Sequence, residues 1–510
     1  MLSDRRMLFF GMVFCVLVSC TQIDRKNIDY ERLRETLIQD TSLSRYSHLI
    51  DTIIQFFSRE IPHQSSQRLS IGQGRSMVHL DELSVSQIDS LRDQLSPTSR
   101  IRFETIRDED FIDEEFLADR IRYALKMAER YPWNHTIPDS ILINYLVPYK
   151  FMDEFPSKWW SFLAPHYKDS IKLWSSPDYT RFDAADTRQV SIYSTFLMGQ
   201  LPEWWYYDAM ANTYTKYPSL NEILLLRYGG CYIETMINAM ITRTWGIPAA
   251  VEEIPYWGSQ NGSHAAEAFW NPAVGKMVSD PDFSISDNHR RPAKIVRFTF
   301  RKTDAFSRQI KPYLNGNAFQ IPQMSGDHWF DATGQHTDVA KVEYPVGSSW
   351  PDKIKLGYIY VMDYGQWVPI HYGVVEGDRI HFRNMGVDII YRVGYYSAGQ
   401  HHMVSKPFLL QDGGQLKFSE PSREKLITVP VLKYNNGNKA VLDIDESYTL
   451  RFLDENGVWK DHATLVCRDE NPLLFTDVPA GAFYWLKFPS DTRSLSRIFL
   501  LNDQGEQWWY

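Results

Sequence analysis

The chain has 510 residues, which is too many for a single hydrophobic core, so roughly three domains are expected. Hydrophobic residues make up 44% and charged residues 23%, as in an ordinary globular protein. The net charge of −9 comes without any block of lysine and arginine, which argues against nucleic acid as a partner.

The N-terminus has the pattern of an export signal. A positively charged start precedes an apolar run over residues 7–18, which is too short to span a membrane and is typical of a secretory leader. Residues 17–20, Leu-Val-Ser-Cys, also resemble the bacterial lipobox. The resemblance implies that 1–19 is a lipoprotein signal peptide, that Cys20 carries a lipid, and that the protein is tethered to a membrane of the bacterial cell envelope, periplasmic or surface-exposed. The alternatives are an ordinary signal peptide or a short anchor.

The cysteines do not predict a disulfide framework. Of the four, one leaves with the leader and Cys20 takes the lipid, so Cys231 and Cys467 remain as thiols in separate predicted domains. No metal-ligand spacing of cysteine and histidine is present, and His401-His402 are interpreted as surface residues in a turn. We therefore expect no metal and no cofactor.

Residues 20–174 are predicted to form a helical N-terminal region, because apolar residues recur at helical spacing among charged ones from 27 to 172. Residues 64–74 are interpreted as a polar loop. The pairs Trp159-Trp160 and Trp204-Trp205 are either sugar-stacking platforms or, more commonly, core aromatics. The region is expected to pack against the catalytic core that follows.

The segment 175–335 contains the residues that indicate a chemistry. Gly229-Gly230 allow a sharp turn, and Cys231 then opens a helical pattern that Gly246 and Pro248 end. A cysteine in the first turn of a helix lies close to unpaired backbone N–H groups and the positive end of the helix dipole. We therefore expect a thiolate at Cys231.

A histidine and an aspartate follow this helix at the ends of two strand-like runs. His264 comes after the loop 259–263, and Asp280 comes after a short turn and a second apolar run. Two adjacent antiparallel strands would bring both to one end of a hairpin, as a Cys-His-Asp triad requires. Asp282 competes with Asp280, and each candidate could instead be an ordinary core, surface or turn residue.

Four motifs in this order resemble the transglutaminase-like branch of the papain-like cysteine enzymes. They are Arg227-Tyr-Gly-Gly-Cys231, Gly246-Ile-Pro-Ala249, Asn261-Gly-Ser-His264 and Asp280-Pro281. The resemblance implies a helix carrying Cys231 packed on an antiparallel sheet. It makes Cys231 the nucleophile, His264 the base and then the acid, and Asp280 the residue that orients it. The sequence departs from the family at Ala266, where a tryptophan is frequent, and at Glu234, one place later than expected.

Residues 336–425 and 426–510 are predicted to form two β-rich, sandwich-like domains, because short strands alternate with Gly, Asp and Asn turns. Nothing in these strands indicates a chemistry, so a spacer or recognition role is expected. The predicted fold class is thus α+β. The order of helical region, core and β-rich tail resembles exported lipoproteins of Bacteroidetes-type bacteria.

Taken together, the resemblances imply a membrane-tethered cysteine enzyme that acts on an amide or peptide bond through a thioester acyl-enzyme. Its expected partners are a peptide, protein or glycopeptide substrate and, through the lipid, a membrane. Hydrolysis is favoured over cross-linking. Two rivals remain: an inactive lipoprotein that binds glycan or peptide, which Ala266 favours, and a structural envelope protein.

Overall fold

The computed structural model describes residues 28–73, 76–96, 99–130, 136–167, 205–208, 214–271, 275–279, 290–314, 319–435, 438–440, 442–468, 472–488, 496–502 and 504–510. The predicted leader, Cys20 and Asp280 lie outside them. The described residues form a mixed α+β fold, which confirms the predicted fold class. No helix among these residues is both long and apolar enough to cross a membrane.

Helices form most of the N-terminal region, where the apolar spacing predicts them. They are α1 (Tyr30–Ile38), α2 (Ser47–Glu60), α3 (Val85–Gln94), α4 (Glu114–Arg130), α5 (Asp139–Tyr145) and α6 (Trp159–Tyr167). In α1, Leu33 and Leu37 are buried one turn apart. Asp29 caps this helix, because its carboxylate accepts a hydrogen bond from the backbone N–H of Arg32 at 3.0 Å.

The prediction of a polar loop over residues 64–74 is wrong. Ser65–Gln73 form β1, the middle strand of an antiparallel sheet with β2 (Ser76–His79) and β3 (Ile101–Arg107) at its edges. Leu69 and Ile71, two residues apart, are buried in the core. Their alternation with polar residues specifies a strand with one covered face, although the segment is polar overall.

A five-stranded antiparallel sheet lies at the centre of the molecule, in the order β10-β9-β6-β7-β8. Its strands are β6 (Ala249–Ile254), β7 (His264–Asn271), β8 (Lys276–Ser279), β9 (Val296–Phe298) and β10 (Trp329–Asp331). The helix α10 (Cys231–Thr244) packs against β6 and β7. Gly246 ends the turn after α10 with φ +79°, and a Cβ there would lie 2.6 Å from the backbone of Met127 in α4. Only glycine fits this close approach.

The N-terminal helices, α10 and the central sheet share one hydrophobic core. Trp159 and Trp160 lie inside it, and the guanidinium of Arg120 lies 4.5 Å and 5.0 Å from the centroids of their rings. The interpretation of this tryptophan pair as core aromatics is confirmed. Trp205 is also buried, whereas Trp204 lies outside the described residues.

The next part of the chain forms a larger antiparallel sheet, in the order β11-β14-β13-β12-β15-β17-β18, with β16 paired to β15. The strands are β11 (Val339–Pro345), β12 (Leu356–Asp363), β13 (Gln366–Glu376), β14 (Arg379–Gly386), β15 (Ile389–Ser397), β16 (Gln400–Met403), β17 (Phe408–Leu410) and β18 (Leu416–Phe418). His401-His402 lie on β16 and not in a surface turn, which corrects the prediction. A hydrogen bond of 3.0 Å joins His401 Nδ1 to the Tyr360 hydroxyl, so the ring is part of the packing.

The C-terminal strands form a module with its own hydrophobic core. They are β19 (Leu426–Val431), β20 (Lys433–Asn435), β21 (Asn438–Ala440), β22 (Ser447–Leu453), β23 (Trp459–Val466), β24 (Leu473–Pro479), β25 (Tyr484–Lys487), β26 (Ile498–Leu501) and β27 (Gln507–Trp509). Five of them pair in the order β23-β22-β25-β26-β27. Cys467 is not part of a disulfide and is fully buried in this core.

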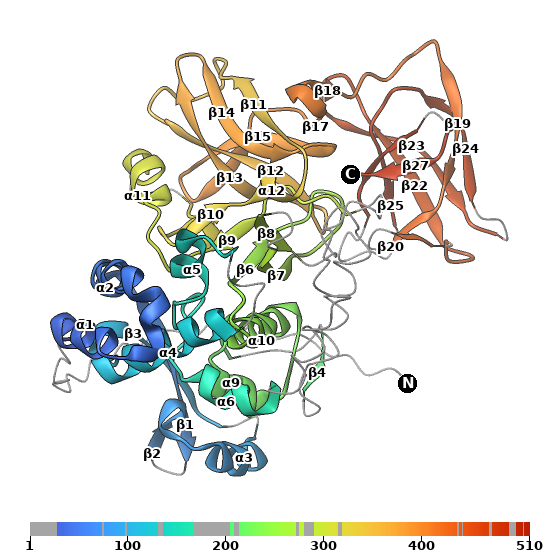
Figure 1. Ribbon diagram of the computed structural model, residues 1–510. Helices are drawn as coiled ribbons and strands as arrows, with labels where there is room; N and C mark the ends of the chain where they lie inside the picture. The colour runs from blue at the N-terminus through green and yellow to red at the C-terminus, as the bar shows by residue number, and fades with distance from the viewer. Residues whose placement is uncertain are drawn as a thin grey trace.

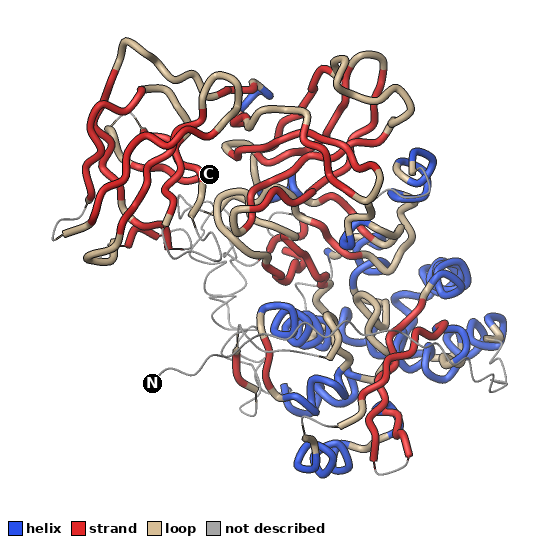
Figure 2. The backbone as a smooth tube through the Cα atoms, turned by 180° about the vertical axis from the view of Figure 1, so that it is seen from behind, coloured by secondary structure: helices blue, strands red, loops and turns tan. Residues whose placement is uncertain are grey.

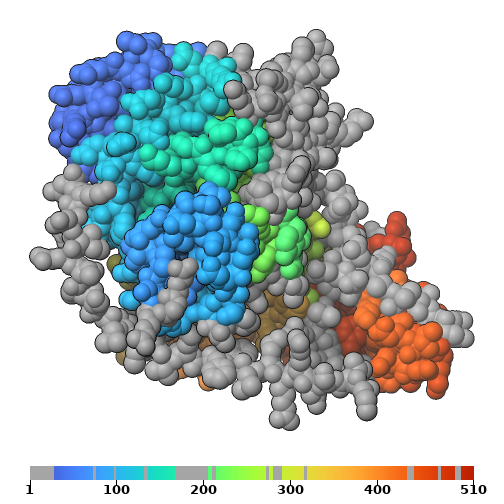
Figure 3. Space-filling model, turned by 90° about the horizontal axis from the view of Figure 1, so that it is seen from below, coloured from blue at the N-terminus to red at the C-terminus, as the bar shows by residue number. Residues whose placement is uncertain are grey.

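The central sheet lies between the helical region and the larger sheet, and the C-terminal module lies beside the latter (Figures 1 and 2). Seen from below, atoms of the N-terminal region cover much of the surface, and the green segment that leads into α10 lies next to them (Figure 3). The start of α10 is therefore placed where the helical region and the sheet meet.

Candidate functional site

Cys231 is the first residue of α10, in the position that its spacing predicts. The preceding helix α9 (Leu220–Leu226) ends at Arg227, whose φ of 59° turns the chain toward the cysteine. At Gly229 a Cβ would lie 2.6 Å from Ile233 Cδ1, so no larger residue fits. Arg227 also contacts α3 through Asp89, with 2.5 Å between Nη2 and Oδ1. The turn that presents the cysteine is thus fixed by both its backbone and its neighbours.

The sulfur of Cys231 lies beside the start of β7. The backbone N–H groups of Ala265 and Tyr232 donate hydrogen bonds to it, and both contacts favour the thiolate. Burial acts in the opposite direction and has the larger effect, with a further contribution from the carboxylate of Glu234, so the pKa of Cys231 is raised. The expected thiolate is therefore corrected: at neutral pH the group is a thiol.

His264 is the first residue of β7 and directly precedes Ala265. It is paired with Ile254 of β6, and its ring stacks on Trp257, with ring centroids 5.9 Å apart and planes 23° apart. The stack restricts the orientation of the imidazole and covers one of its faces. Because Ala265 donates to the sulfur, Cys231 lies at the end of β7 where His264 begins the strand.

A buried carboxylate that the sequence analysis missed lies next to this pair. Glu253 of β6 is fully buried and is paired across the sheet with Ala265. Its carboxylate accepts hydrogen bonds from Lys216 (2.8 and 3.0 Å), Tyr217, Tyr232 (3.1 Å) and Gln323 (2.9 Å). The sequence did contain a sign of this buried carboxylate: Glu252 and Glu253 are consecutive glutamates inside an otherwise apolar strand. A charge buried in such a strand requires hydrogen-bonding or ionic partners.

Tyr232 connects Glu253 to the loop before His264. Its hydroxyl lies 3.1 Å from Glu253 Oε1 and 3.0 Å from Ser263 Oγ, so the residue after the cysteine also fixes the residue before the histidine. A pocket of about 290 Å³ opens beside Glu253, lined in part by Lys216 and Gln323. A buried polar network around Glu253 therefore links the residues next to Cys231 and His264 to a cavity that neither candidate lines.

The loop that leads to His264 is held by the C-terminal module. The side chain of Arg497 is almost fully buried, and its guanidinium donates to five oxygen atoms, one of which is the backbone oxygen of Tyr510 at 3.0 Å. The other four belong to Gly258 (backbone, 2.6 Å), Gln260 (backbone, 2.9 Å), Asn261 (side chain, 3.1 Å) and Met362 (backbone, 2.7 Å). Only a guanidinium can supply so many donors in one plane.

The β12–β13 hairpin holds the same loop from another side. The backbone N–H of Tyr364 donates to the side chain of Asn261 at 3.0 Å, and the N–H of Gly262 donates to Asp363 Oδ1 at 2.7 Å. Gly262 has φ +90°, a conformation that favours glycine. The larger sheet and the C-terminal module therefore both position the segment that carries His264, which a spacer role does not explain.

Asp280, the third predicted residue, lies outside the described residues. The strand before it ends at Ser279, whose hydroxyl donates to Glu252, and Glu252 is also bonded to Arg297 (2.7 Å) and His336 (3.0 Å). Burial opposes ionisation of Glu252, but these partners outweigh burial and lower its pKa from 4.5 to about 2. A buried ionic network thus anchors the strand that leads to Asp280.

Replacing Glu252 with glutamine is expected to remove acid-sensitive stability. A carboxyl whose pKa falls from 4.5 to about 2 on folding contributes about 3 kcal/mol above pH 4.5, and this is lost as the pH falls toward 2. Urea unfolding should show a large difference between wild type and Glu252→Gln at pH 7 that shrinks below pH 4. Glu455→Gln, which breaks only an exposed pair with Arg423, is the control. Equal losses at pH 7 and pH 3 would contradict this role.

Nothing in the described part of the chain groups three or more His, Cys, Asp or Glu side chains in a way that could hold a metal ion. Ala266 is buried on the sheet and places no aromatic ring at that position.

Comparison with known proteins gives little. No family model matches the chain. No curated protein matches it either. Among solved structures, the chain is similar to the crystal structure of red sea bream transglutaminase, with 10% identity over 90% of this chain and 78% of that one, at a TM-score of 0.22. Since a TM-score this low carries no argument, the case for a function rests on the geometry above.

Proposed function

We propose that the protein is a cysteine-dependent enzyme of transglutaminase-like type that acts on an amide or peptide bond. The observation that supports the proposal is the hydrogen bond from Ala265 N–H to the Cys231 sulfur, since Ala265 directly follows His264 in β7. A nucleophile at a helix N-terminus next to a base is what acyl transfer through cysteine requires. Asp280 is proposed to orient His264, as the motif resemblance implies.

The proposed reaction has two halves. The Cys231 sulfur attacks the carbonyl carbon while its proton passes to His264, and the C–N bond breaks as His264 returns that proton to the leaving amine. Water or an amine then attacks the thioester, and His264 again carries the proton. The backbone N–H of Cys231 is proposed as one donor to the oxyanion. We favour water as the acceptor, as the resemblance in a bacterial envelope protein suggests, so that the enzyme is a hydrolase.

The raised pKa of Cys231 determines how the nucleophile is activated. Because the resting group is a thiol, His264 must remove the proton during the attack rather than before it. The pocket beside Glu253 is proposed to receive a substrate side chain, since Lys216 and Gln323 line it and bind the carboxylate paired with Ala265. The substrate class remains a peptide, protein or glycopeptide.

The proposal includes the membrane tether. With 1–19 removed as a signal peptide and Cys20 acylated, the enzyme would act at the bacterial cell envelope, and its substrate would be a molecule of that compartment. Metabolic labelling with an alkyne-bearing fatty acid tests this, because Cys20→Ala should abolish the label and Cys231→Ala should not.

A catalytically inactive binder of glycan or peptide is the second candidate. One observation favours it: burial raises the pKa of Cys231, which an inert core cysteine would also show. The two candidates differ in whether His264 controls the reactivity of the thiol.

The rate of Cys231 alkylation by iodoacetamide is expected to rise with pH, with a midpoint above the value of about 8.5 for a free thiol. His264→Ala should lower the rate at pH 7 about tenfold or more, because the base that assists the attack is lost. Mass spectrometry of the peptide that contains Cys231 separates it from the buried Cys467. A rate that does not depend on His264 would favour the inactive binder.

A further inference from the structure

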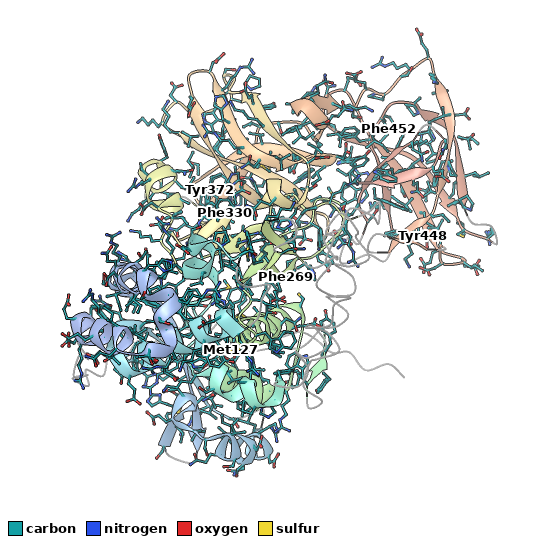
Figure 4. The ribbon with its side chains drawn as sticks, viewed as in Figure 1. Met127, Phe269, Phe330, Tyr372, Tyr448 and Phe452 are labelled. Carbon is teal, nitrogen blue, oxygen red and sulfur yellow. The ribbon has the colours of Figure 1, made fainter. Side chains whose placement is uncertain are left out.

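A second cavity, of about 610 Å³, lies where the central sheet meets the larger sheet. Its walls come from the helix α11 (Ala305–Gln309), the edge strand β10, and the neighbouring strands β13 and β14. Figure 4 shows Phe330 of β10 and Tyr372 of β13 at this junction. A concave site between two sheets is a common location for a small-molecule ligand.

Aromatic rings line this cavity at two depths. Phe330 and Tyr313 are 42% and 38% exposed and lie at its rim, whereas Trp329 and Tyr372 are buried. Exposed rings of this size offer apolar faces that water solvates poorly. The cavity is therefore suited to a ligand with a C–H-rich face.

Three buried polar atoms of the lining have no hydrogen-bond partner among the described residues: Trp329 Nε1, His371 Nδ1 and His381 Nδ1. His381 Nδ1 lies 3.6 Å from Glu343 Oε1, beyond hydrogen-bond range. Buried polar atoms are almost always paired, so such atoms around one cavity indicate a ligand with hydroxyl or amide groups. Trp329 supplies a donor, and a neutral imidazole supplies one donor and one acceptor.

The charges inside the cavity compensate each other. Lys294 Nζ lies 2.7 Å from Asp331 Oδ2 and also donates to the backbone oxygens of Arg383 and Asn384. Burial, together with this ammonium, lowers the pKa of His371 to about 3, so its ring is neutral at pH 7. Arg308, which also lines the cavity, pairs with Asp304 at 2.8 Å, and the remaining charged side chains of the lining, Arg383 and Glu376, are of opposite sign. The charges of the lining therefore balance, and the lining favours an uncharged ligand.

The edge of β10 does not offer a peptide a strand to pair with. Thr303 Oγ donates to the backbone oxygen of Trp329 at 2.8 Å, and so occupies an acceptor that an added strand would need. A peptide is therefore the less favoured occupant.

We propose that the cavity between α11, β10 and β13–β14 binds a neutral saccharide unit. Its apolar face would stack on Phe330 and Tyr313, and its hydroxyl groups would pair with Trp329 Nε1 and His371 Nδ1. This binding site is independent of the reaction proposed at Cys231.

The test is titration of the full chain with neutral trisaccharides of glucose, N-acetylglucosamine, mannose and xylose, followed by calorimetry. At least one is expected to bind with a dissociation constant in the millimolar range or below. Phe330→Ala should weaken it about three- to tenfold, the loss expected for one stacking contact. His371→Ala should weaken it as well, whereas Cys231→Ala should bind like wild type.

Phe103→Ala is the matched control, because Phe103 lies on β3 and is 45% exposed, close to the exposure of Phe330. If Phe103→Ala binds like wild type, the weaker binding of Phe330→Ala comes from the loss of a ring at the cavity and not from the loss of any exposed phenylalanine. The proposal is overturned if none of the four trisaccharides binds, or if Phe330→Ala and Phe103→Ala have the same effect. Binding of trigalacturonate or of an uncharged tetrapeptide in their place overturns the choice of ligand class.

Discussion

Replacing Cys231 with alanine is expected to abolish the burst of p-nitrophenol that the wild type releases from p-nitrophenyl acetate. The burst would report formation of the acyl-enzyme, and under the proposed function this requires Cys231, whose sulfur accepts a hydrogen bond from the residue after His264. Without the nucleophile, the rate should fall about a thousandfold, to the level of the uncatalysed reaction. Stopped-flow absorbance measures the burst, and its amplitude should equal the concentration of active protein.

The control for this variant is Cys467→Ala. Cys467 is fully buried in the C-terminal module, so its loss should cost some stability but leave the burst unchanged below the unfolding temperature. His264→Ala should slow the burst without reducing its final amplitude. An acetyl group found by mass spectrometry on a residue other than Cys231 would contradict the assignment of the nucleophile.

Arg497→Ala is expected to lower both activity and stability, although Arg497 belongs to a different module from Cys231. Its removal leaves the oxygens of Gly258, Gln260 and Met362 without their donor. We expect a loss of about 3 kcal/mol in the free energy of unfolding. Activity should fall about a hundredfold, because a displacement of His264 by about 1 Å is sufficient for such a loss. Urea unfolding and the acetate burst measure the two effects.

The variant Arg497→Lys tests whether the loop before His264 requires the positive charge of Arg497 or the planar arrangement of its N–H donors. The ammonium keeps the positive charge but cannot donate to five oxygens in one plane, so most of the loss should persist. Arg423→Ala, at an exposed side chain just before β19, should have no effect on either measurement. If Arg497→Lys has full activity, the positive charge of Arg497, and not the set of hydrogen bonds made by its guanidinium, positions the loop before His264.

Local sequence patterns allowed the positions of Cys231 and His264 at the starts of a helix and a strand to be predicted. Gly230 and Gly246 mark the two ends of α10, and the positions of Cys231 and His264 follow from elements only a few residues long. The strand β1 was missed because its polarity outweighed its alternation of Leu69 and Ile71. Signals of this kind come from residues that are neighbours in the sequence, and the signal for the helix α10 was stronger than the signal for the strand β1.

The remainder of the site could not be predicted from the sequence. The thiolate was expected from the helix N-terminus alone, whereas the pKa of Cys231 depends on how deeply the folded chain buries it. The contact of Arg497 with Asn261 joins residues 236 positions apart, and no local pattern encodes it. The burial of Glu253 could be suspected from its strand, but its four partners come from several separate segments.

The hydrogen bonds from Arg497 to the loop before His264 also have a consequence for biosynthesis. A ribosome that has just made Asn261 must add 236 more residues before Arg497 exists. Domains fold roughly in the order of synthesis, so the helical region and the central sheet would fold first. The loop before His264 would then be loosely held until the C-terminal module packed against it. A chain interrupted before Arg497 would thus yield a folded fragment in which the loop before His264 is poorly held, and this loop would become fixed only after Arg497 has been made.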